Sequence, residues 1–505
     1  MQKSLLIRTD ANPVIGTGHV MRMIALAQAW RTSGNEVLFL CSEITSPLEQ
    51  RIRVEDFQLE KISGPPGSAD DLEATAAIVS RDAKSDRSMA VALDGYQFGA
   101  DFQLGVKKEG ARLLVVDDYS HADAYHADIV LNQNISAREE LYSQRNDGTQ
   151  LLLGPRFALL RREFLHNHGW VRSIPNEAKK LLVTLGGADV GNVTKKIIGA
   201  LAGSGLEVKV VVGGSNPHLA SVQQAADASS KGETDVELVL NSSDMPALMQ
   251  WADMAVAAGG STSWELAFTG LPSLFIILAD NQEENAHELE RHGFGLCLGR
   301  HSKFDASNFR KTLDRLAGDK ALRANFAVCG RDTVDGRGAR RVVSILEGDE
   351  DLELTPVTET DCELLWEWAN DSATRANSFD SAPIPLERHK EWFRAKLQDP
   401  HCRFLMATNQ KLGKIGVVRF DCDNAKATIS VSVASHARGK DFGKRLLSSA
   451  CDQMLAHSGV DMIRAFIKPT NKASLRAFEA VGFVRDAGTT IQGQPAEQYL
   501  LRRTS

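Results

Sequence analysis

The segment Ile15–Arg22 combines two glycines and a histidine in a pattern that could bind an anion and move a proton. It follows a short apolar run and opens a long amphipathic stretch, which predicts a strand-to-helix junction. Gly16 and Gly18 would let the backbone approach a ligand at the helix N-terminus, where N–H groups and the helix dipole favour negative charge. His19 would project from the first turn, where a neutral imidazole accepts a proton near pH 7. A tight turn with a capping or core histidine is the alternative interpretation.

Three later segments repeat this setting. Leu185–Asp189 and Ala257–Glu265 each lead from an apolar run into a helical stretch, where backbone amides could meet a diphosphate. The Glu265 carboxylate suits two ribose hydroxyls. The third segment, Asn281–Asn285, opens the next helix, and the side-chain amides of Asn281 and Gln282 suit a sugar. Taken singly, each segment is better explained as a cap or a turn. Their recurrence at the carboxyl ends of strands favours a ligand site, with candidate residues Gly16, Gly18, Gly186, Gly187, Gly260, Ser261, Thr262, Glu265, Asn281 and Gln282.

A second group of informative residues lies near the C-terminus. The strand-like run Val431–Ala434 leads into Arg438–Leu447, a basic, glycine-bearing loop that opens a helix and could hold another phosphate. Downstream, Asn471–Phe483 begins a second helix and ends it with Gly-Phe. This order of strand, loop, helix, strand and Asn-led helix predicts a second, separate ligand site.

The N-terminal motifs require parallel strands to position them. Residues 1–345 alternate short apolar runs with amphipathic stretches, as in Leu5–Arg8 followed by His19–Thr32. This alternation predicts parallel sheets covered by helices on both faces. The polar stretch His166–Asn176 separates two such series, so we expect two doubly wound lobes, residues 1–165 and 178–346. Ligands would bind in the cleft between them.

A second boundary falls at the acidic run Glu347–Asp351. After it the pattern changes to mixed strands and helices, which indicates one compact α+β domain over residues 352–505. The expected fold class is therefore α/β: two doubly wound Rossmann-like lobes followed by an α+β domain.

The composition argues against several classes of protein. The 505 residues carry a formal charge of −7, which gives no sign of a basic surface for nucleic acid or an anionic membrane. The seven cysteines are scattered without a C-x-x-C pair, and no metal-ligand cluster is visible, so we expect free thiols and no metal. No apolar run reaches the roughly 18 residues of a spanning helix, and no signal peptide is evident. We expect a cytoplasmic protein without nucleic-acid or membrane partners.

The motifs of residues 1–345 resemble the GT-B nucleotide-sugar fold, and most closely the UDP-2,4-diacetamido-2,4,6-trideoxy-β-L-altropyranose hydrolases of pseudaminic acid synthesis. The resemblance covers Arg8–Asp10, Ile15–Arg22, Val116–Asp118, Asn132–Asn134, Gly154–Arg161, Gly186–Asp189, Gly260–Glu265 and Asn281–Gln282. It implies inverting hydrolysis at the anomeric carbon, which releases UDP and the free sugar, with His19 as the general base. It also implies that Gly260, Ser261, Thr262 and Glu265 hold UDP, while Asn281 and Gln282 face the sugar and pyrophosphate.

The C-terminal pattern resembles the GCN5-related N-acetyltransferases over residues 352 to about 503. The resemblance implies acetyl-CoA as co-substrate, with backbone amides of Arg438–Gly443 on the pyrophosphate. The strand near Val433 would bond the pantetheine arm. The implied acetyl-CoA-binding residues are Val433, Arg438, Gly439, Gly443, Lys444, Asn471 and Ser474.

Two positions depart from this family pattern. Asp441 stands where glycine is usual, and a carboxylate about 5 Å from a phosphate would cost roughly 3 kcal/mol at an effective dielectric of 20. We expect it to point into water, where the cost falls below about 1 kcal/mol. Phe478 stands where many members have a tyrosine that protonates the departing thiolate, so the acid for that step is unassigned.

Within the superfamily, the nearest resemblance is to acetyltransferases that modify the 4-amino group of the UDP-amino-sugar precursor of pseudaminic acid. The two resemblances together imply a bifunctional enzyme. It would acetylate a UDP-4-amino-4,6-dideoxy-β-L-AltNAc-type sugar and then hydrolyse UDP from the diacetamido product. Three alternatives stay open. The first is a GT-B glycosyltransferase that uses another acceptor in place of water, and the second is a nucleotide-sugar-binding protein with a degenerate acetyltransferase domain. The third is N-acetylation of a protein or peptide, which the fusion disfavours.

Overall fold

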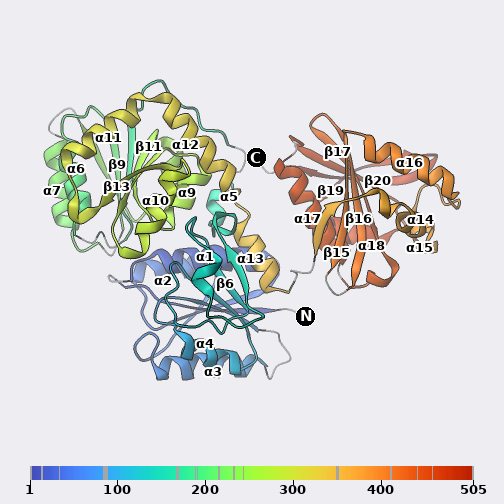
Figure 1. Cartoon of the computed structure of the whole chain (residues 1–505), viewed down its shortest axis with the longest axis horizontal. Helices are drawn as coiled ribbons and strands as arrows, with labels where there is room; N and C mark the ends of the chain where they lie inside the picture. The colour runs from blue at the N-terminus through green and yellow to red at the C-terminus, as the bar shows by residue number, and fades with distance from the viewer. Residues whose placement is uncertain are drawn as a thin grey trace. The chain divides into compact units, whose positions relative to one another are not determined.

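The computed structural model describes residues 3–12, 15–32, 34–83, 89–166, 170–187, 189, 191–213, 216–230, 234–242, 244–348, 352–409, 412–440, 442–457 and 459–502. The chain divides into two compact units, Met1–Glu347 and Gly348–Thr504 (Figure 1). The first unit contains two parallel sheets, and the second contains one mixed sheet.

The first lobe of the N-terminal unit is a parallel sheet with strand order β3-β2-β1-β4-β5-β6-β7. Its strands are β1 (Ser4–Thr9), β2 (Glu36–Cys41), β3 (Gln58–Lys61), β4 (Met89–Asp94), β5 (Arg112–Val116), β6 (Ile129–Asn132) and β7 (Gln150–Leu153). Its helices are α1 (Gly18–Thr32), α2 (Ser46–Val54), α3 (Ala69–Ala83), α4 (Ala100–Lys108) and α5 (Arg162–Leu165), with short 3-10 turns η1 (Glu139–Tyr142) and η2 (Pro155–Phe157).

Alternate residues of the central strands enter different cores, so both faces of this sheet are buried. In β1, Leu5 and Ile7 pack with α1 and α2, whereas Leu6 packs with α3 and α4. Figure 1 shows α3 and α4 on the opposite side of the sheet from α1. Continuous apolar runs such as Leu5–Ile7 are the expected signature of a parallel sheet covered on both faces.

The second lobe repeats this arrangement with strand order β10-β9-β8-β11-β12-β13. Its strands are β8 (Lys180–Thr184), β9 (Glu207–Val212), β10 (Asp235–Leu240), β11 (Met254–Ala258), β12 (Ser273–Ile277) and β13 (Gly295–Arg300). Its helices are α6 (Val193–Ala200), α7 (Leu219–Ser229), α8 (Met245–Trp251), α9 (Thr262–Phe268), α10 (Glu283–Arg291), α11 (Ala306–Gly318) and α12 (Lys320–Thr333), with η3 (Asp280–Gln282) and η4 (His301–Lys303).

The last helix of this unit, α13 (Gly338–Leu346), packs on the first lobe. Its apolar side chains Ala339, Val342, Val343 and Leu346 join the core that contains α1. The second-lobe range expected from sequence, 178–346, therefore includes a helix that belongs spatially to the first lobe, because its apolar face is buried against α1.

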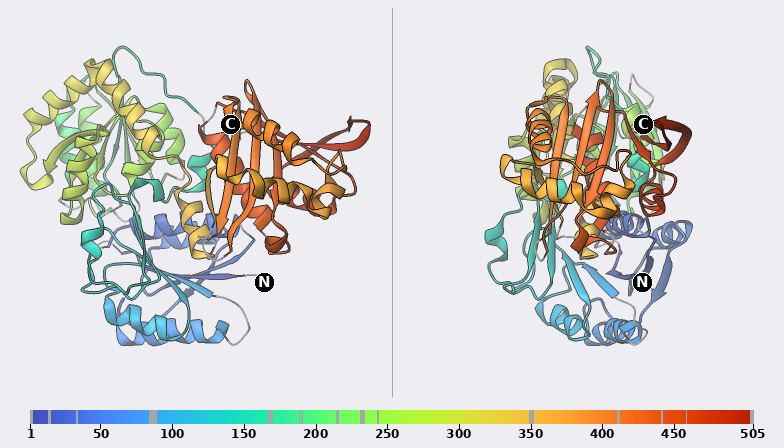
Figure 2. Two further views of the ribbon diagram at one scale, coloured as in Figure 1. Left: turned by 45° about the vertical axis from the view of Figure 1, so that its right-hand side comes forward. Right: turned by 90° about the vertical axis from the view of Figure 1, so that its right-hand side faces the viewer.

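The C-terminal unit is a mixed sheet with strand order β14-β15-β16-β17-β18-β20-β19. Its strands are β14 (Glu353–Pro356), β15 (Cys402–Asn409), β16 (Gly413–Asp423), β17 (Lys426–Val433), β18 (Met462–Ile467), β19 (Val484–Ile491) and β20 (Gln494–Arg502). Its helices are α14 (Cys362–Asn370), α15 (Ser372–Asn377), α16 (Leu386–Gln398), α17 (Phe442–His457) and α18 (Lys472–Ala480), with η5 (Glu359–Asp361) and η6 (Ser435–Ala437). Figure 2 shows β19 and β20 extending as a hairpin from this sheet.

The fold class predicted from sequence is confirmed: two Rossmann-like lobes precede an α+β domain. In each lobe the strand order reverses at one point, between β1 and β4 in the first and between β8 and β11 in the second. Ligands of doubly wound sheets bind at the carboxyl ends of the strands beside such a point. The predicted glycine motifs lie after β1, β8 and β11, which border these two points.

Candidate active sites

His19 forms a close pair with Asp94 at the reversal point of the first lobe. His19 lies in the first turn of α1, directly after the β1 loop, and Asp94 is the last residue of β4, the neighbouring strand. His19 Nδ1 lies 2.6 Å from Asp94 Oδ1, and the Asp94 side chain is fully buried. Because an ionised carboxylate only accepts hydrogen bonds, this contact places the imidazole proton on Nδ1 and leaves the lone pair on Nε2.

Arg22 fixes the Asp94 carboxylate from the other side. Its Nε donates to Asp94 Oδ2 at 2.7 Å and its NH2 donates to Oδ1 at 2.6 Å. Burial alone would raise the pKa of Asp94, but the charges and hydrogen bonds of Arg22 and His19 outweigh burial and hold that pKa well below its usual range. Asp94 is therefore a carboxylate at every physiological pH, and it orients the His19 ring.

A hydrogen-bond chain leads from Arg22 to the second lobe. Arg22 NH1 donates to Asp118 Oδ1 at 2.8 Å, and the Tyr96 hydroxyl donates to Asp118 Oδ2 at 2.7 Å. Asn281 Nδ2, in η3 of the second lobe, donates to the Tyr96 hydroxyl at 2.8 Å. Burial, together with the charge of Asp118, raises the pKa of Tyr96 far above its usual range, so this phenol is neutral.

The glycine loops of the two lobes face each other beside His19. A Cβ placed on Gly18 would lie 3.5 Å from Ser261 Oγ, and one placed on Gly187 would lie 2.8 Å from Thr17 Cγ2. Gly187 is thus required for close approach of the loops, whereas Gly16 and Gly186 each adopt a φ of 81° that favours glycine.

The remaining predicted residues of the second lobe line the same region. Gly260 precedes α9, and a Cβ on it would lie 3.6 Å from Gln282 Nε2. Gln282 is anchored through Oε1, which accepts from the Leu278 amide at 3.1 Å. Thr262 is the first residue of α9. The structure therefore brings the ten predicted nucleotide-sugar residues and His19 to the facing carboxyl edges of the two sheets.

Glu265 has a partner that sequence analysis did not anticipate. Arg161 NH2 donates to Glu265 Oε1 at 2.8 Å, and Arg161 NH1 donates to Glu163 Oε1 at 2.8 Å. Burial raises the pKa of Glu265, although Arg161 opposes that shift. One oxygen of Glu265 is thus engaged in the described structure, which reduces the expected two-oxygen contact with ribose to one oxygen unless Arg161 moves.

Of the residues that surround His19 and Glu265, Asp94 and Tyr96 lie outside the segments singled out from the sequence. Arg22, Asp118 and Arg161 lie within those segments but were assigned no role. Asp94 carried the clearest signal, because it ends the buried strand Met89–Asp94 and lies at a carboxyl strand end. The pairing of Arg161 with Glu265 had no sequence signal, since the two residues are 104 positions apart.

In the C-terminal unit, β17 and β18 diverge beside the predicted acetyl-CoA loop. They pair in parallel only at Lys426–Thr428 with Met462–Arg464, so the described pairing leaves one edge of the following β17 residues without a strand partner. At Val433 the backbone carbonyl is already bonded to Arg438 Nε. An extended ligand could bond backbone groups at such an edge. Gly439 has a φ of 74°, and Lys444 is exposed near the N-terminus of α17.

The Arg438 side chain is directed to the protein itself. Its Nε donates to the Val433 carbonyl at 3.0 Å, and its NH2 forms a 2.7 Å ion pair with Asp371 Oδ2. Hydrogen bonds from Arg438 and from the Thr374 amide lower the pKa of Asp371 to about 2. Arg438 thus ties the loop to the N-terminus of α15, and any contact with acetyl-CoA would come from its backbone.

Asn471 caps α18, with Oδ1 accepting from the Ser474 amide at 3.1 Å. Asn471 and Ser474, which were predicted to bind acetyl-CoA, are therefore in contact, and the hydrogen bond between them is a helix cap. Phe478 is buried on the same helix and packs edge-on against Phe483 with ring centroids 4.9 Å apart. Asp441 lies outside the described residues.

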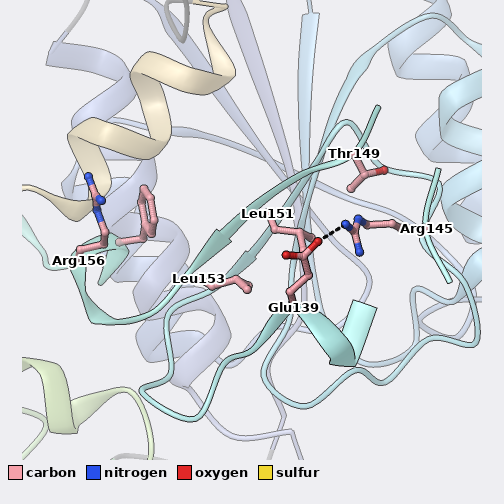
Figure 3. A pocket seen from close by; sticks show the side chains of 7 residues that line it. Glu139, Arg145, Thr149, Leu151, Leu153 and Arg156 are labelled. Carbon is pink, nitrogen blue, oxygen red and sulfur yellow. Dashed lines mark hydrogen bonds and ion pairs between the residues drawn. The ribbon is translucent and has the colours of Figure 1, made fainter. Parts of the chain in front are cut away.

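We examined the described residues for metal ligands, membrane-spanning helices and further cavities besides the two candidate sites. Among the described residues, no group of three or more His, Cys, Asp or Glu side chains could hold a metal ion. No described helix is long and apolar enough to cross a membrane. A hollow of about 510 Å³ lies along β7 and contains a Glu139–Arg145 ion pair, and none of the predicted site residues lines it (Figure 3).

Comparisons with known proteins agree with the two-unit structure. The Glycosyltransferase family 28 C-terminal domain matches residues 181–325, and the Acetyltransferase (GNAT) domain matches residues 351–484. The UDP-2,4-diacetamido-2,4,6-trideoxy-beta-L-altropyranose hydrolase of Campylobacter jejuni is 24% identical over 57% of this chain and 97% of its own length. The chain is a fusion of a unit similar to this hydrolase family with a GNAT domain.

Two further relatives bear on the hydrolase-like unit and on the fusion. A Helicobacter pylori protein named as pseudaminic acid cytidylyltransferase and UDP-2,4-diacetamido-2,4,6-trideoxy-beta-L-altropyranose hydrolase is 26% identical over 38% of this chain and 34% of its own length. An uncharacterised protein of Methanocaldococcus jannaschii is 23% identical over 95% of this chain and 96% of its own. The match to that archaeal protein therefore extends through both the hydrolase-like unit and the GNAT domain.

Proposed function

We propose that the hydrolase-like unit releases UDP from UDP-2,4-diacetamido-2,4,6-trideoxy-β-L-altropyranose with inversion at the anomeric carbon. The observation that carries the proposal is the His19–Asp94 pair, which lies opposite the glycine loops of the second lobe. The names of the Campylobacter and Helicobacter relatives supply the substrate. Together they favour hydrolysis of this nucleotide sugar.

His19 Nε2 is the base in the proposed reaction. It takes a proton from water as the water oxygen bonds to the anomeric carbon, while Asp94 stabilises the imidazolium that forms. The bond from the anomeric carbon to the diphosphate oxygen breaks, and UDP leaves with the electron pair. Attack opposite the leaving group accounts for inversion.

The second lobe holds UDP in this proposal. Backbone amides around Gly260, Ser261 and Thr262 meet the diphosphate at the start of α9, and Glu265 accepts a hydrogen bond from ribose. Gly16, Gly18, Gly186 and Gly187 let the facing loops close on the diphosphate. Asn281 and Gln282 face the sugar end, where Asn281 is already bonded to Tyr96.

We further propose that the GNAT domain transfers an acetyl group from acetyl-CoA to the 4-amino group of a UDP-4-amino-4,6-dideoxy-β-L-AltNAc-type sugar. The amine attacks the thioester carbonyl, an amide forms, and CoA leaves as the thiol after proton transfer. The edge of β17 that lacks a described strand partner, and the loop with Gly439, Gly443 and Lys444, support acetyl-CoA binding. The pantetheine arm would meet backbone groups of β17 other than the Val433 carbonyl, which is bonded to Arg438. Asn471 and Ser474 flank the opposite side. The product of this step is the substrate proposed for the hydrolase-like unit.

Mass spectrometry of the full chain with the UDP-4-amino sugar, with and without acetyl-CoA, tests both steps. We expect acetylated nucleotide sugar followed by free diacetamido sugar and UDP, and neither product without acetyl-CoA. UDP release that requires an added acceptor other than water would instead establish a glycosyltransferase. Binding of the nucleotide sugar without any turnover would establish a binding protein.

The variant His19→Ala separates the two activities within one chain. It should stop UDP release while acetylation continues at the wild-type rate, because the two sites lie in different units. Hydrolysis at an unchanged rate would refute His19 as the base.

A further inference from the structure

Three aromatic rings form a row at the carboxyl edge of the first lobe. His19 follows β1, Tyr96 follows β4 and Tyr119 follows β5, and these strands are consecutive neighbours in the sheet. The ring centroids of His19 and Tyr96 are 4.9 Å apart, and those of Tyr96 and Tyr119 are also 4.9 Å apart. Both spacings are ordinary aromatic contact distances, and the order of the three strands explains why the rings follow one another in this order along the edge.

The turn that carries Tyr119 is fixed by a buried carboxylate. Asp117 Oδ1 accepts from the backbone amides of Asp118, Tyr119 and Ser120 at 2.5, 3.0 and 3.2 Å. His121 Nδ1 lies 3.1 Å from the same oxygen. The backbone of Tyr119 is therefore preorganised, and the contact with Tyr96 positions its ring.

Tyr119 nevertheless leaves 45% of its surface exposed. Tyr96 lies edge-on beside it, and the Tyr96 hydroxyl is occupied by Asp118 and Asn281. A large ring that is held rigidly but only partly covered loses little entropy when a ligand packs on it.

The facing lobe shows which part of a nucleotide sugar lies near this ring. Loop residues after β1, Thr17 and Gly18, face Gly187 and Ser261, where the diphosphate is proposed to bind. One strand further along the first sheet, Tyr96 contacts Asn281 at the proposed sugar end. Tyr119 lies one more strand in the same direction, so it lies on the sugar side of His19.

We propose that Tyr119, together with the Tyr96 ring, forms an aromatic wall for the apolar groups of the sugar, its acetamido and C6 methyl groups. The wall selects deoxygenated, N-acylated sugars over fully hydroxylated ones, because burying hydroxyls against rings without hydrogen bonds is unfavourable. This inference rests on the hydrolase function proposed above. It assigns Tyr119 to substrate specificity and leaves proton transfer to His19.

Steady-state hydrolysis by the full-length variants Tyr119→Ala and Tyr119→Phe tests the wall. For Tyr119→Ala we expect kcat/KM for the diacetamido sugar nucleotide to fall about tenfold, mainly through KM, as for loss of an apolar contact of methyl size. Tyr119→Phe keeps the ring and should match the wild type. The Kd for UDP, measured by calorimetry, should not change in either variant.

A second probe checks selectivity. UDP-N-acetylglucosamine, which carries hydroxyls at C4 and C6, is used as a competitive inhibitor of wild type and of Tyr119→Ala. The ratio of its Ki to the KM of the diacetamido substrate should fall about tenfold in Tyr119→Ala, since only the less polar sugar loses contacts.

Three outcomes would overturn the inference. Unchanged kinetics in Tyr119→Ala would exclude a contact with substrate, and an equal loss of UDP affinity would show that the substitution disturbs the turn instead. A wild-type protein that binds UDP but neither binds nor hydrolyses the diacetamido sugar nucleotide would overturn the proposed function and the wall together. Either of the first two outcomes, seen beside hydrolysis by wild type, would overturn the wall alone.

Discussion

Asp94 Oδ1 lies 2.6 Å from His19 Nδ1, and the two residues are 75 positions apart in the chain. The contact exists because β1 and β4 are neighbours, with Thr9 paired to Asp94 in the parallel register. The carboxylate thus reaches the histidine in the first turn of α1. A histidine held in this way by a buried carboxylate has one fixed tautomer, which a general base requires.

The first prediction concerns this contact. Asp94→Asn should lower kcat for UDP release by about a hundredfold to ten-thousandfold, because the amide does not stabilise an imidazolium and permits the wrong tautomer. The Kd for UDP should change little. Discontinuous assays of UDP release measure kcat, and calorimetry measures the Kd for UDP.

Asp101→Asn, at an exposed position of α4 in the same lobe, is the matched control and should behave as wild type. Full hydrolytic activity in Asp94→Asn would show that His19 acts without its carboxylate partner.

The low pKa of Asp94 predicts an acid-dependent contribution to stability. The pKa in the folded protein lies below its ordinary value of about 4, so the stabilisation is complete above about pH 4 and is lost as pH falls through the folded value. The part of the free energy of unfolding that depends on the Asp94 carboxylate should therefore be present at pH 5, where it appears as a difference between wild type and Asp94→Asn.

Below about pH 4 that difference should shrink. Urea titrations of both full-length proteins, followed by circular dichroism, measure it at each pH. A difference that grows on acidification has the opposite sign and would contradict the assigned pairing of Asp94 with Arg22 and His19.

The Arg161–Glu265 ion pair predicts how UDP binding responds to substitution. Glu265→Gln should weaken UDP binding about tenfold, because a neutral amide is a poorer acceptor for a ribose hydroxyl than a carboxylate. Calorimetry with UDP alone measures this without turnover.

Glu163→Gln provides the control, since it removes the other carboxylate partner of Arg161 and leaves Glu265 in place. If Glu265→Gln and Glu163→Gln weaken UDP binding equally, the effect comes from the disturbed Arg161 and not from a lost contact with ribose.

The substitution Gly443→Ala tests the acetyl-CoA loop without disturbing the protein in the absence of coenzyme. A Cβ at this position would meet only Val433 Cγ2 at 3.7 Å, an ordinary contact, so Gly443→Ala should not lower the melting temperature. It should weaken acetyl-CoA binding at least tenfold if the coenzyme phosphates approach this backbone closely.

Gly439→Ala gives the contrasting result. A Cβ there has open space, but φ of 74° is unfavourable for alanine, so stability should fall by about 1 kcal/mol. Calorimetry with acetyl-CoA and thermal unfolding separate the two effects. Unchanged coenzyme affinity in Gly443→Ala would place the phosphates elsewhere.

The strand-to-helix loops were predictable from local sequence because their chemistry is local. Gly16 to His19 and Gly260 to Glu265 follow apolar runs directly, and parallel sheets require such loops at their carboxyl edges. Short strands were harder: β3, β6 and β7 have four residues each, too few to establish a periodicity.

The amino-acid sequence by itself determined the two lobes, the α+β domain and the loops that carry His19, Ser261 and Gly443. Only the tertiary structure decided that Asp94 orients His19, that Arg161 engages Glu265, that α13 returns to the first lobe, and that Tyr119 lies in line with Tyr96. The physical reason is that periodicity and turn chemistry act over a few residues, whereas these pairings depend on strand order. Strand order is set by burial of whole sheet faces, which no local pattern records.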